Sequence, residues 1–284
     1  MPELPDLLHV ESQLAPVFVG ARIIGLRVGD PVPFRVMIDA KIPDLLLGRT
    51  LTAVERRGHF MRFAFTEDVV LVVNAMLAGR YAMVPAAADP KADPKSLVLA
   101  LSFDNGKELR YLDAKRMGKI YVARPAQENT IPSYATLGVD VMSHAFTLPV
   151  FAELIRGRRD QVRNFLMDKG ALASIGNAYA DEILFAAGIH PKTFCYQLQP
   201  HAVEVLFNAV RSVLTGASEH IAREGPAVDE KLRDFLMVRG RAGQPCPRCK
   251  TTLRKVRVGA ADSDFCPHCQ PPGRALFIDW SRKP

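Results

Sequence analysis

Hydrophobic spacing divides the chain into a strand-rich first part and a helical second part. Up to about residue 130, short apolar or alternating segments bounded by turn residues predict β-strands, namely Phe60–Phe65, Val69–Val73, Leu97–Phe103 and Leu109–Leu112. Between the last two, Asp104-Asn105-Gly106 indicates a hairpin turn. The exception is Leu4–Phe18, where apolar residues recur at helical spacing before Gly20. Pro85–Lys95, rich in Ala, Asp, Pro and Lys, is expected to be an exposed loop.

From about Leu148 the apolar period becomes helical. It predicts helices over Phe151–Met167, Asn177–Ala187 and Val203–Ala222, with ends or turns at Gly170, Gly176 and Gly188. Short helices joined by a Gly-containing turn permit a helix-turn-helix-like unit. After Arg239 the chain is rich in Gly, Pro and Cys and too short for its own apolar core, so a metal must stabilise it. We predict three domains, at residues 1–130, 131–238 and 239–284.

Composition narrows the partner class. The 284 residues are 48% hydrophobic, and no apolar run reaches the roughly 18 residues of a membrane span. The N-terminus lacks signal-peptide features, so we expect the bacterial cytoplasm or nucleoid and no membrane. The net charge of +7 favours a polyanionic partner. Between Leu236 and Ala261 there is no acidic residue, which predicts phosphate contacts or, alternatively, a solvated surface; the basic residues there are Arg239, Arg241, Arg248, Lys250, Arg254, Lys255 and Arg257.

Four cysteines carry the spacing of a zinc ribbon. Cys246 and Cys249 form one C-x2-C pair, Cys266 and Cys269 form another, and 16 residues separate the pairs. Four thiolates complete a tetrahedron, so we predict one Zn²⁺ ion with a structural role. His268, inside the second pair, is an alternative ligand. The fifth cysteine, Cys195, is expected to be a small buried hydrophobe.

The first residues carry a second kind of chemistry. Removal of Met1 would leave Pro2 with a secondary amine that can attack a sugar C1′ and form an iminium. Glu3 beside it could move protons during that attack. Farther along, Gly176 permits a tight turn, and Asn177 can cap the helix that follows. The N-terminus of such a helix also binds phosphate.

Three blocks of sequence, in this order, resemble one known family. They are Met1-Pro2-Glu3-Leu4-Pro5-Asp6, then Ile175-Gly176-Asn177-Ala178-Tyr179-Ala180-Asp181-Glu182 with Ala187-Gly188-Ile189-His190-Pro191, and then Gly240-Arg241-x-Gly243-Gln244-Pro245-Cys246. The chain resembles the formamidopyrimidine-DNA glycosylase and endonuclease VIII (Fpg/Nei) proteins as far as about Gln270. The resemblance implies a multidomain α+β fold: an N-terminal β-sandwich with an N-terminal helix, a helix-two-turn-helix domain, and a C-terminal four-cysteine zinc-finger β-hairpin.

The resemblance also implies an activity of base-excision repair. The family's bifunctional glycosylase and AP-lyase mechanism would use Pro2 as the nucleophile and Glu3 as the acid/base, removing oxidised or ring-opened bases and cutting the strand by β- and δ-elimination. The partner would be double-stranded DNA with damaged bases or abasic sites, and we expect a monomer. The residues expected to contact DNA are His59, Met76, Arg116, Met117, Asn177, Arg241, Arg254, Lys255 and Arg257. Among these, Met76, Arg116 and Met117 would fill the gap left by an everted nucleotide.

Several positions depart from the family pattern. His59 stands where many members have Lys, and Ala261, followed by Asp262-Ser263-Asp264, stands where an Arg usually contacts phosphate. The segment between Asp234 and Gly240 leaves no room for the long loop that covers an everted purine. These departures favour an endonuclease VIII-like or divergent member. They leave open a catalytically weakened DNA-damage or DNA-structure binder, or a glycosylase for bulky or cross-linked bases.

Residues 271–284 extend beyond the usual finger. Their apolar residues Leu276, Phe277 and Trp280 would pack on the body of the protein, or alternatively offer a site for a partner or for DNA.

Overall fold

The computed structural model describes residues 2–86 and 94–273. Most of the predicted 85–95 loop, and the C-terminal residues Leu276, Phe277 and Trp280, therefore lie outside the described residues. The chain forms two compact units: Met1–Leu137 with Ser218–Leu232, and Gly138–Ala217 with Arg233–Pro284. The three domain limits drawn from the sequence stay a prediction. No helix in the described part of the chain is long and apolar enough to cross a membrane.

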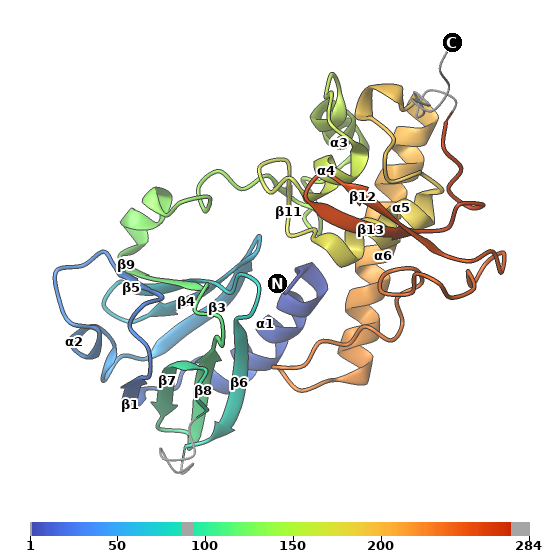
Figure 1. Ribbon diagram of the computed structural model, residues 1–284. Coiled ribbons are helices and arrows are strands. Elements are labelled where there is room, and N and C mark those ends of the chain that lie inside the picture. Colours follow the sequence, from blue (N-terminus) through green and yellow to red (C-terminus); the bar gives the residue numbers. More distant parts are fainter. Residues whose placement is uncertain (1, 87–93, 274–284) are drawn as a thin grey trace. The chain divides into compact units, whose positions relative to one another are not determined.

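The first unit contains two sheets (Figure 1). The five-stranded sheet has the order β2-β9-β5-β4-β3, with strands at Phe34–Val36, Lys119–Ala123, Val69–Asn74, Phe60–Phe65 and Leu51–Arg57. The four-stranded sheet has the order β1-β7-β8-β6, with strands at Ile23–Val28, Leu97–Phe103, Lys107–Leu112 and Arg80–Pro85. The strands predicted from apolar spacing are present. The predicted turn joins β7 to β8, with Gly106 at φ 77° and the Asn105 side chain accepting the Lys107 N–H.

The side-chain alternation of the strands explains why both faces of the larger sheet are apolar. Leu71 and Val73 of β5 lie in one core with Leu99 and Leu101 of β7, so this core joins the two sheets. Successive strand residues point to opposite faces. Val70 and Val72 accordingly face a second cluster, whose other buried members are Phe60, Ala123, Ile131 and Tyr134. The N-terminal β-sandwich is confirmed.

The helices of the first unit close the sandwich. Helix α1, Leu4–Phe18, buries Leu7, Val10, Leu14 and Phe18 in the main core and contacts β3. Their spacing of three or four residues places them on one helix face. The predicted helix is thus confirmed at both ends. The shorter helical segments are α2 at Ile42–Leu46 and the 3₁₀ helix η2 at Pro125–Thr130.

The second unit is mainly helical. Its α-helices are α3 at Leu148–Ile155, α4 at Val162–Met167, α5 at Asn177–Ala187 and α6 at Pro200–Glu224, whose last turns group with the first unit. The 3₁₀ helix η3 covers Cys195–Gln197, and β10 (Val139–Asp140) pairs in parallel with β11 (Leu172–Ala173). The predicted helices at 177–187 and 203–222 are confirmed, and the latter begins three residues earlier.

The single helix predicted over Phe151–Met167 is wrong. The chain leaves α3 at Arg156 in extended conformation, and Gly157 follows at φ 71° in the left-handed region that glycine tolerates. Arg158 then pairs with both Asp160 and Asp168, which fixes the connection before α4 begins. Apolar periodicity continued through this break because both helices face the same core.

The cysteine-rich segment contains a hairpin between its two cysteine pairs. Strands β12, Arg254–Val258, and β13, Ala261–Phe265, pair antiparallel. The apolar cluster beneath the cysteines consists of Phe185, Val238 and Leu253 with Cys246 and Cys266. The module therefore has only a few apolar residues of its own and borrows Phe185 from α5, in line with the expected need for a metal.

Candidate active site

Pro2 and Glu3 stand at the beginning of α1. Glu3 is the N-cap residue; its N–H donates to Asp6 Oδ2 over 2.8 Å, and the two residues form a capping box. The Glu3 side chain is 7% exposed. The capping contacts therefore hold the Glu3 side chain in place next to Pro2. Farther along the helix, His9 Nε2 contacts the Pro226 carbonyl at 2.9 Å.

Pro2 lines a narrow crevice that borders a larger hollow in the same unit. The crevice, of about 20 Å³, has room for about one water molecule. The hollow has a volume of about 760 Å³. The two spaces share the charged residues Arg80, Asp229, Glu230 and Lys231. A reactive amine at Pro2 would therefore lie beside a space large enough for a substrate group and lined by charges of both signs.

The turn after β5 contains Met76 and an exposed leucine beside it. Met76 is half-buried and has φ 46°, with its N–H held by the Asn74 side chain. The next residue, Leu77, is 53% exposed and lines the hollow. Some proteins insert apolar side chains between base steps. The family resemblance pointed to Met76, whose contact with DNA stays a prediction, and Leu77 is the more exposed residue of the same turn.

Arg116 and Met117 lie in a second exposed loop. Arg116 has φ 55° and pairs with Asp30, Nε to Oδ2 at 2.6 Å, while Met117 is 39% exposed. The neighbouring Ala114 and Lys115 line the hollow with Leu77. This loop and the Leu77 turn therefore border one space. By contrast, His59 is buried and its ring packs at 4.4 Å from that of Phe60; its expected contact with DNA stays a prediction.

In the second unit, Asn177 is held by a buried arginine that the sequence analysis did not single out. Arg163 is fully buried; its Nη2 donates to Asn177 Oδ1 over 2.9 Å, and its Nε donates to Asp181 Oδ1 over 2.8 Å. Because Asn177 uses its oxygen as an acceptor here, its amide N–H groups remain as donors on an exposed side chain. The expected capping role is wrong in detail, since Gly176 is the N-cap and Asn177 is the first helical residue.

Asp181 joins helix α5 to the hairpin. Its carboxylate also accepts from Arg239 Nη1 at 2.7 Å, Ser263 Oγ at 2.6 Å and the Asp264 N–H at 3.0 Å. Asp264 is itself buried and accepts the Gly240 N–H. Of the two acids that follow Ala261, only Asp262 is exposed. The Asp264 side chain is used inside the unit and does not add to the charge of its surface.

The next residue, Glu182, fixes the segment that leads into the finger. Its carboxylate accepts the backbone N–H groups of Met237, Val238 and Arg239 at 2.8–2.9 Å. Burial raises the pKa of Glu182, although these three hydrogen bonds favour the charged form. Acidic residues at 181 and 182 in an otherwise apolar helix were the available signal for this role.

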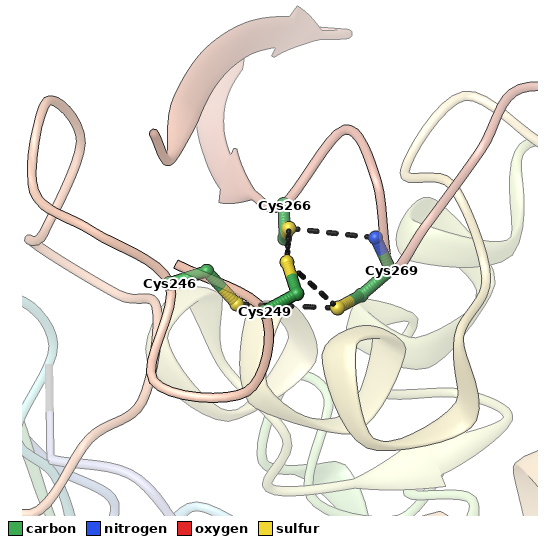
Figure 2. A group of neighbouring side chains, drawn as sticks. All are labelled: Cys246, Cys249, Cys266 and Cys269. Carbon is green, nitrogen blue, oxygen red and sulfur yellow. Dashed lines mark hydrogen bonds between the residues drawn. The ribbon is translucent and has the colours of Figure 1, made fainter. Parts of the chain in front are cut away.

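The four cysteines converge on one point (Figure 2). Their sulfur atoms all lie within 4.8 Å of one another. The Sγ atoms of Cys249 and Cys266 are 3.4 Å apart, and those of Cys246 and Cys269 are 3.9 Å apart. A tetrahedral metal with bonds of about 2.3 Å to sulfur requires separations of about 3.8 Å. These residues therefore fit a four-thiolate metal site. Hydrogen bonds from Thr251 lower the pKa of Cys249 to about 6, which favours the thiolate.

The remaining cysteine has the opposite environment. Burial, reinforced by the nearby Asp160, raises the pKa of Cys195 to about 12. The thiol is 4% exposed. It therefore stays protonated, in agreement with the expected small buried hydrophobe.

The basic residues of the hairpin are differently engaged. Arg254, Lys255 and Arg257 are all exposed on β12. Arg241 is half-buried, donates to Gln244 Oε1 and lies near the carbonyls of Leu236 and Met237. The β12 residues thus remain available to a phosphate backbone, and Arg241 has a part in shaping the loop. Contact with DNA by these residues stays a prediction.

Comparison with known proteins agrees with this division of the chain. Residues 1–120 match the family model of the formamidopyrimidine-DNA glycosylase N-terminal domain, residues 137–225 that of its H2TH domain, and residues 243–272 that of the zinc finger found in FPG and IleRS. The formamidopyrimidine-DNA glycosylase of Symbiobacterium thermophilum is 35% identical over 95% of this chain and 90% of its own length. That of Moorella thermoacetica is 33% identical over 90% of this chain and 95% of its own length.

Solved structures agree. The Lactococcus lactis formamidopyrimidine-DNA glycosylase bound to DNA containing an AP site has a TM-score of 0.83 and 26% identity, with 95% of this chain and 100% of that chain covered. The MutM (Fpg) protein of Thermus thermophilus has a TM-score of 0.81 and 28% identity, with 96% and 100% covered. The chain therefore belongs to the formamidopyrimidine-DNA glycosylase family, the DNA glycosylases of base-excision repair.

Proposed function

We propose that the protein is also an AP lyase, and that it acts on duplex DNA through an iminium at Pro2. The observation that carries this proposal is the placement of Pro2 in a crevice beside Glu3, the buried N-cap residue of α1, at the edge of the 760 Å³ hollow. The nucleophile has a carboxylate beside it and adjoining space for a sugar and base. The glycosylase of Lactococcus lactis binds DNA containing an AP site, which is the substrate that a lyase would cut.

The chemistry follows from the amine. After Met1 is removed, the neutral amine of Pro2 attacks C1′, and the base leaves with the electron pair of the N-glycosidic bond and the proton of the amine. The C1′–O4′ bond then breaks, O4′ takes up a proton, and the cationic iminium forms. When a base removes the C2′ proton, the iminium accepts the C–H electron pair, and the resulting enamine expels the 3′ phosphate with the C3′–O electron pair. Glu3 can carry these protons, since a carboxylate within the site serves as acid and base in turn. Removal of the 5′ phosphate in the same way completes δ-elimination.

Trapping tests this proposal. Borohydride reduces an iminium to a stable amine, so the protein and a duplex with an abasic site should become covalently linked. Tight binding to lesion duplexes without nicking or trapping would instead support a DNA-damage binder with weakened catalysis. A panel of duplexes with different lesions gives the lesion preference. The chemical ends of the cleaved strands show the balance of β- and δ-elimination.

We further propose that the metal held by the four cysteines is zinc, and that the finger binds duplex DNA through Arg254, Lys255 and Arg257. Zinc suits a four-thiolate tetrahedron and would have a structural role, because no coordination position is left open. The exposed cations of β12 and the outward amide of Asn177 supply the phosphate contacts. We expect a monomer in the cytoplasm or nucleoid.

Loss of the metal should separate DNA binding from amine chemistry. We expect Cys266→Ser to weaken binding to an abasic duplex by about 30-fold or more, because the hairpin loses the metal that orders its phosphate contacts. Fluorescence anisotropy measures the affinity, and elemental analysis should find one zinc per chain in the native protein. As a control, Cys195→Ala removes a thiol outside the cluster and should keep the zinc. Unchanged affinity in Cys266→Ser would contradict the role of the finger.

We also propose that Leu77, assisted by Met117, enters the stack in place of the everted nucleotide. Leu77→Ala should lower base excision from a lesion duplex by about tenfold, because unstacking is no longer compensated. Cleavage of an abasic site within single-stranded DNA should change much less. Single-turnover rates measure both, with Met76→Ala and Ile24→Ala as comparisons; Ile24 is 59% exposed on β1 and lines neither the hollow nor the crevice. If Met76→Ala lowered base excision more than Leu77→Ala, the inserted side chain would instead be Met76, as the family resemblance implies.

A further inference from the structure

Asp229 occupies an unusual place for an acid in a protein of net charge +7. It is half-buried and lines both the Pro2 crevice and the larger hollow, and Glu230 follows it in both linings. These residues belong to the segment after α6 that groups with the first unit. An acid in this position borders the nucleophile and the space next to it.

The charges around Asp229 indicate that this residue does not bind phosphate. Arg80, Lys115 and Lys231 also line the hollow and are suited to phosphate. A carboxylate repels phosphate, so Asp229 weakens backbone binding unless it faces another part of the nucleotide. Within the part of the chain that the structure describes, Asp229 makes no side-chain hydrogen bond or ion pair. Its acceptor capacity is therefore available to a ligand.

Tyr81 lies between the crevice and the core of the sandwich. Its side chain is 2% exposed; it lines the crevice together with Pro2 and Asp229, and it also lines an inner cavity with Tyr111. Its hydroxyl has no hydrogen-bond partner among the described residues. Buried polar groups in folded proteins are nearly always hydrogen-bonded. Tyr81 is therefore a second residue of the crevice lining, besides Asp229, whose hydrogen bonding is incomplete.

We propose that Asp229, supported by Glu230, selects everted bases whose edge presents an exocyclic amino group. An ionised carboxylate only accepts hydrogen bonds, and in DNA recognition Asp and Glu accept from the exocyclic amino group of cytosine. Oxidised bases that keep an amino group fit this site, and analogues with a carbonyl at the same position are rejected because two acceptors face each other. This inference rests on the proposed function, since it places the base beside Pro2.

A matched pair of lesions tests the inference. 5-Hydroxycytosine and 5-hydroxyuracil differ at position 4, where the first carries an amino group and the second a carbonyl oxygen. Single-turnover base release is measured for both in the same duplex, with an abasic duplex alongside. The wild type should favour 5-hydroxycytosine by about tenfold. In Asp229→Asn this ratio should fall to near one, because an amide offers both a donor and an acceptor.

Two variants complete the design. Glu230→Gln should lower the ratio by a smaller factor, since Glu230 is exposed. Glu219→Gln makes the same change of charge on an exposed residue of α6 that lines neither space, and it should keep the ratio of the wild type. A ratio near one in the wild type, or one unchanged by Asp229→Asn, would overturn the inference. The inference would also be overturned if Asp229→Asn lowered the rates on both lesions and on the abasic duplex by the same factor. Failure of the wild type to cleave the abasic duplex would instead count against the lyase proposal.

Discussion

Replacing Pro2 by glycine is expected to lower borohydride-trapped complex on an abasic duplex by about 100-fold. The glycine amine can still attack C1′, but it forms an imine that must be protonated before it withdraws electrons, whereas the proline iminium is always charged. Glycine also leaves part of the crevice formed with Asp6 and Tyr81 unfilled, so the amine is held less firmly. The measurement is the rate of covalent complex formation on denaturing gels.

Binding provides the control for this variant. Pro2 precedes the capping contact between Glu3 and Asp6, which the substitution leaves in place. Affinity for an uncleavable abasic analogue should therefore remain within about threefold of the wild type. Trapping of Pro2→Gly at the wild-type rate would disprove the assignment of the nucleophile. Loss of binding together with trapping would point to damage to the fold.

Replacing Asp181 by asparagine is expected to destabilise the second unit by about 3–5 kcal/mol. Arg163 and Asp181 are both fully buried, and the substitution leaves the guanidinium without its counter-charge. The same carboxylate receives Arg239, Ser263 and the Asp264 N–H. Asparagine can satisfy only part of this set, because one of its two side-chain heteroatoms is a donor. Thermal unfolding measures the loss.

Hydrogen exchange shows where the loss occurs. The amide of Asp264, bonded to Asp181 in the native protein, should exchange much faster in Asp181→Asn than amides of β5 in the first unit. Asp262→Asn is the matched control, since this neighbouring residue is exposed and only its backbone carbonyl receives Arg163 and Arg239. If both variants unfolded at the same temperature, the network would have no special role in stability.

Much of the fold could be predicted because its signals are local. Apolar alternation placed β4 and β7, helical spacing placed α1, and the cysteine pairs placed the metal site. The break between α3 and α4 was not predicted from the sequence, because apolar spacing shows which face of a helix is buried and does not show whether the helix is continuous. The extended conformation of Arg156 and the left-handed conformation of Gly157 end α3 before α4 begins at Val162.

The site was harder to predict because its polar contacts join distant segments. Arg163 donates a hydrogen bond to the carbonyl of Asp262, which is 99 residues away in the sequence. The sequence pattern of neither segment indicates this partner. Exposure was equally hidden: Met76 and Leu77 are adjacent apolar residues, and the turn decides which one faces outward. The family resemblance correctly indicated the family, but the exposure of neighbouring side chains required the structure.

The position of Pro2 has a practical consequence for handling the protein. A purification tag or fusion partner placed ahead of Pro2 would turn its amine into an amide, which cannot form an iminium, and would need a passage out of a crevice of about 20 Å³. Affinity tags therefore belong at the other terminus. Preparations should be checked by intact mass for loss of Met1, because under the proposed mechanism the fraction of trimmed chains sets the upper limit on active enzyme.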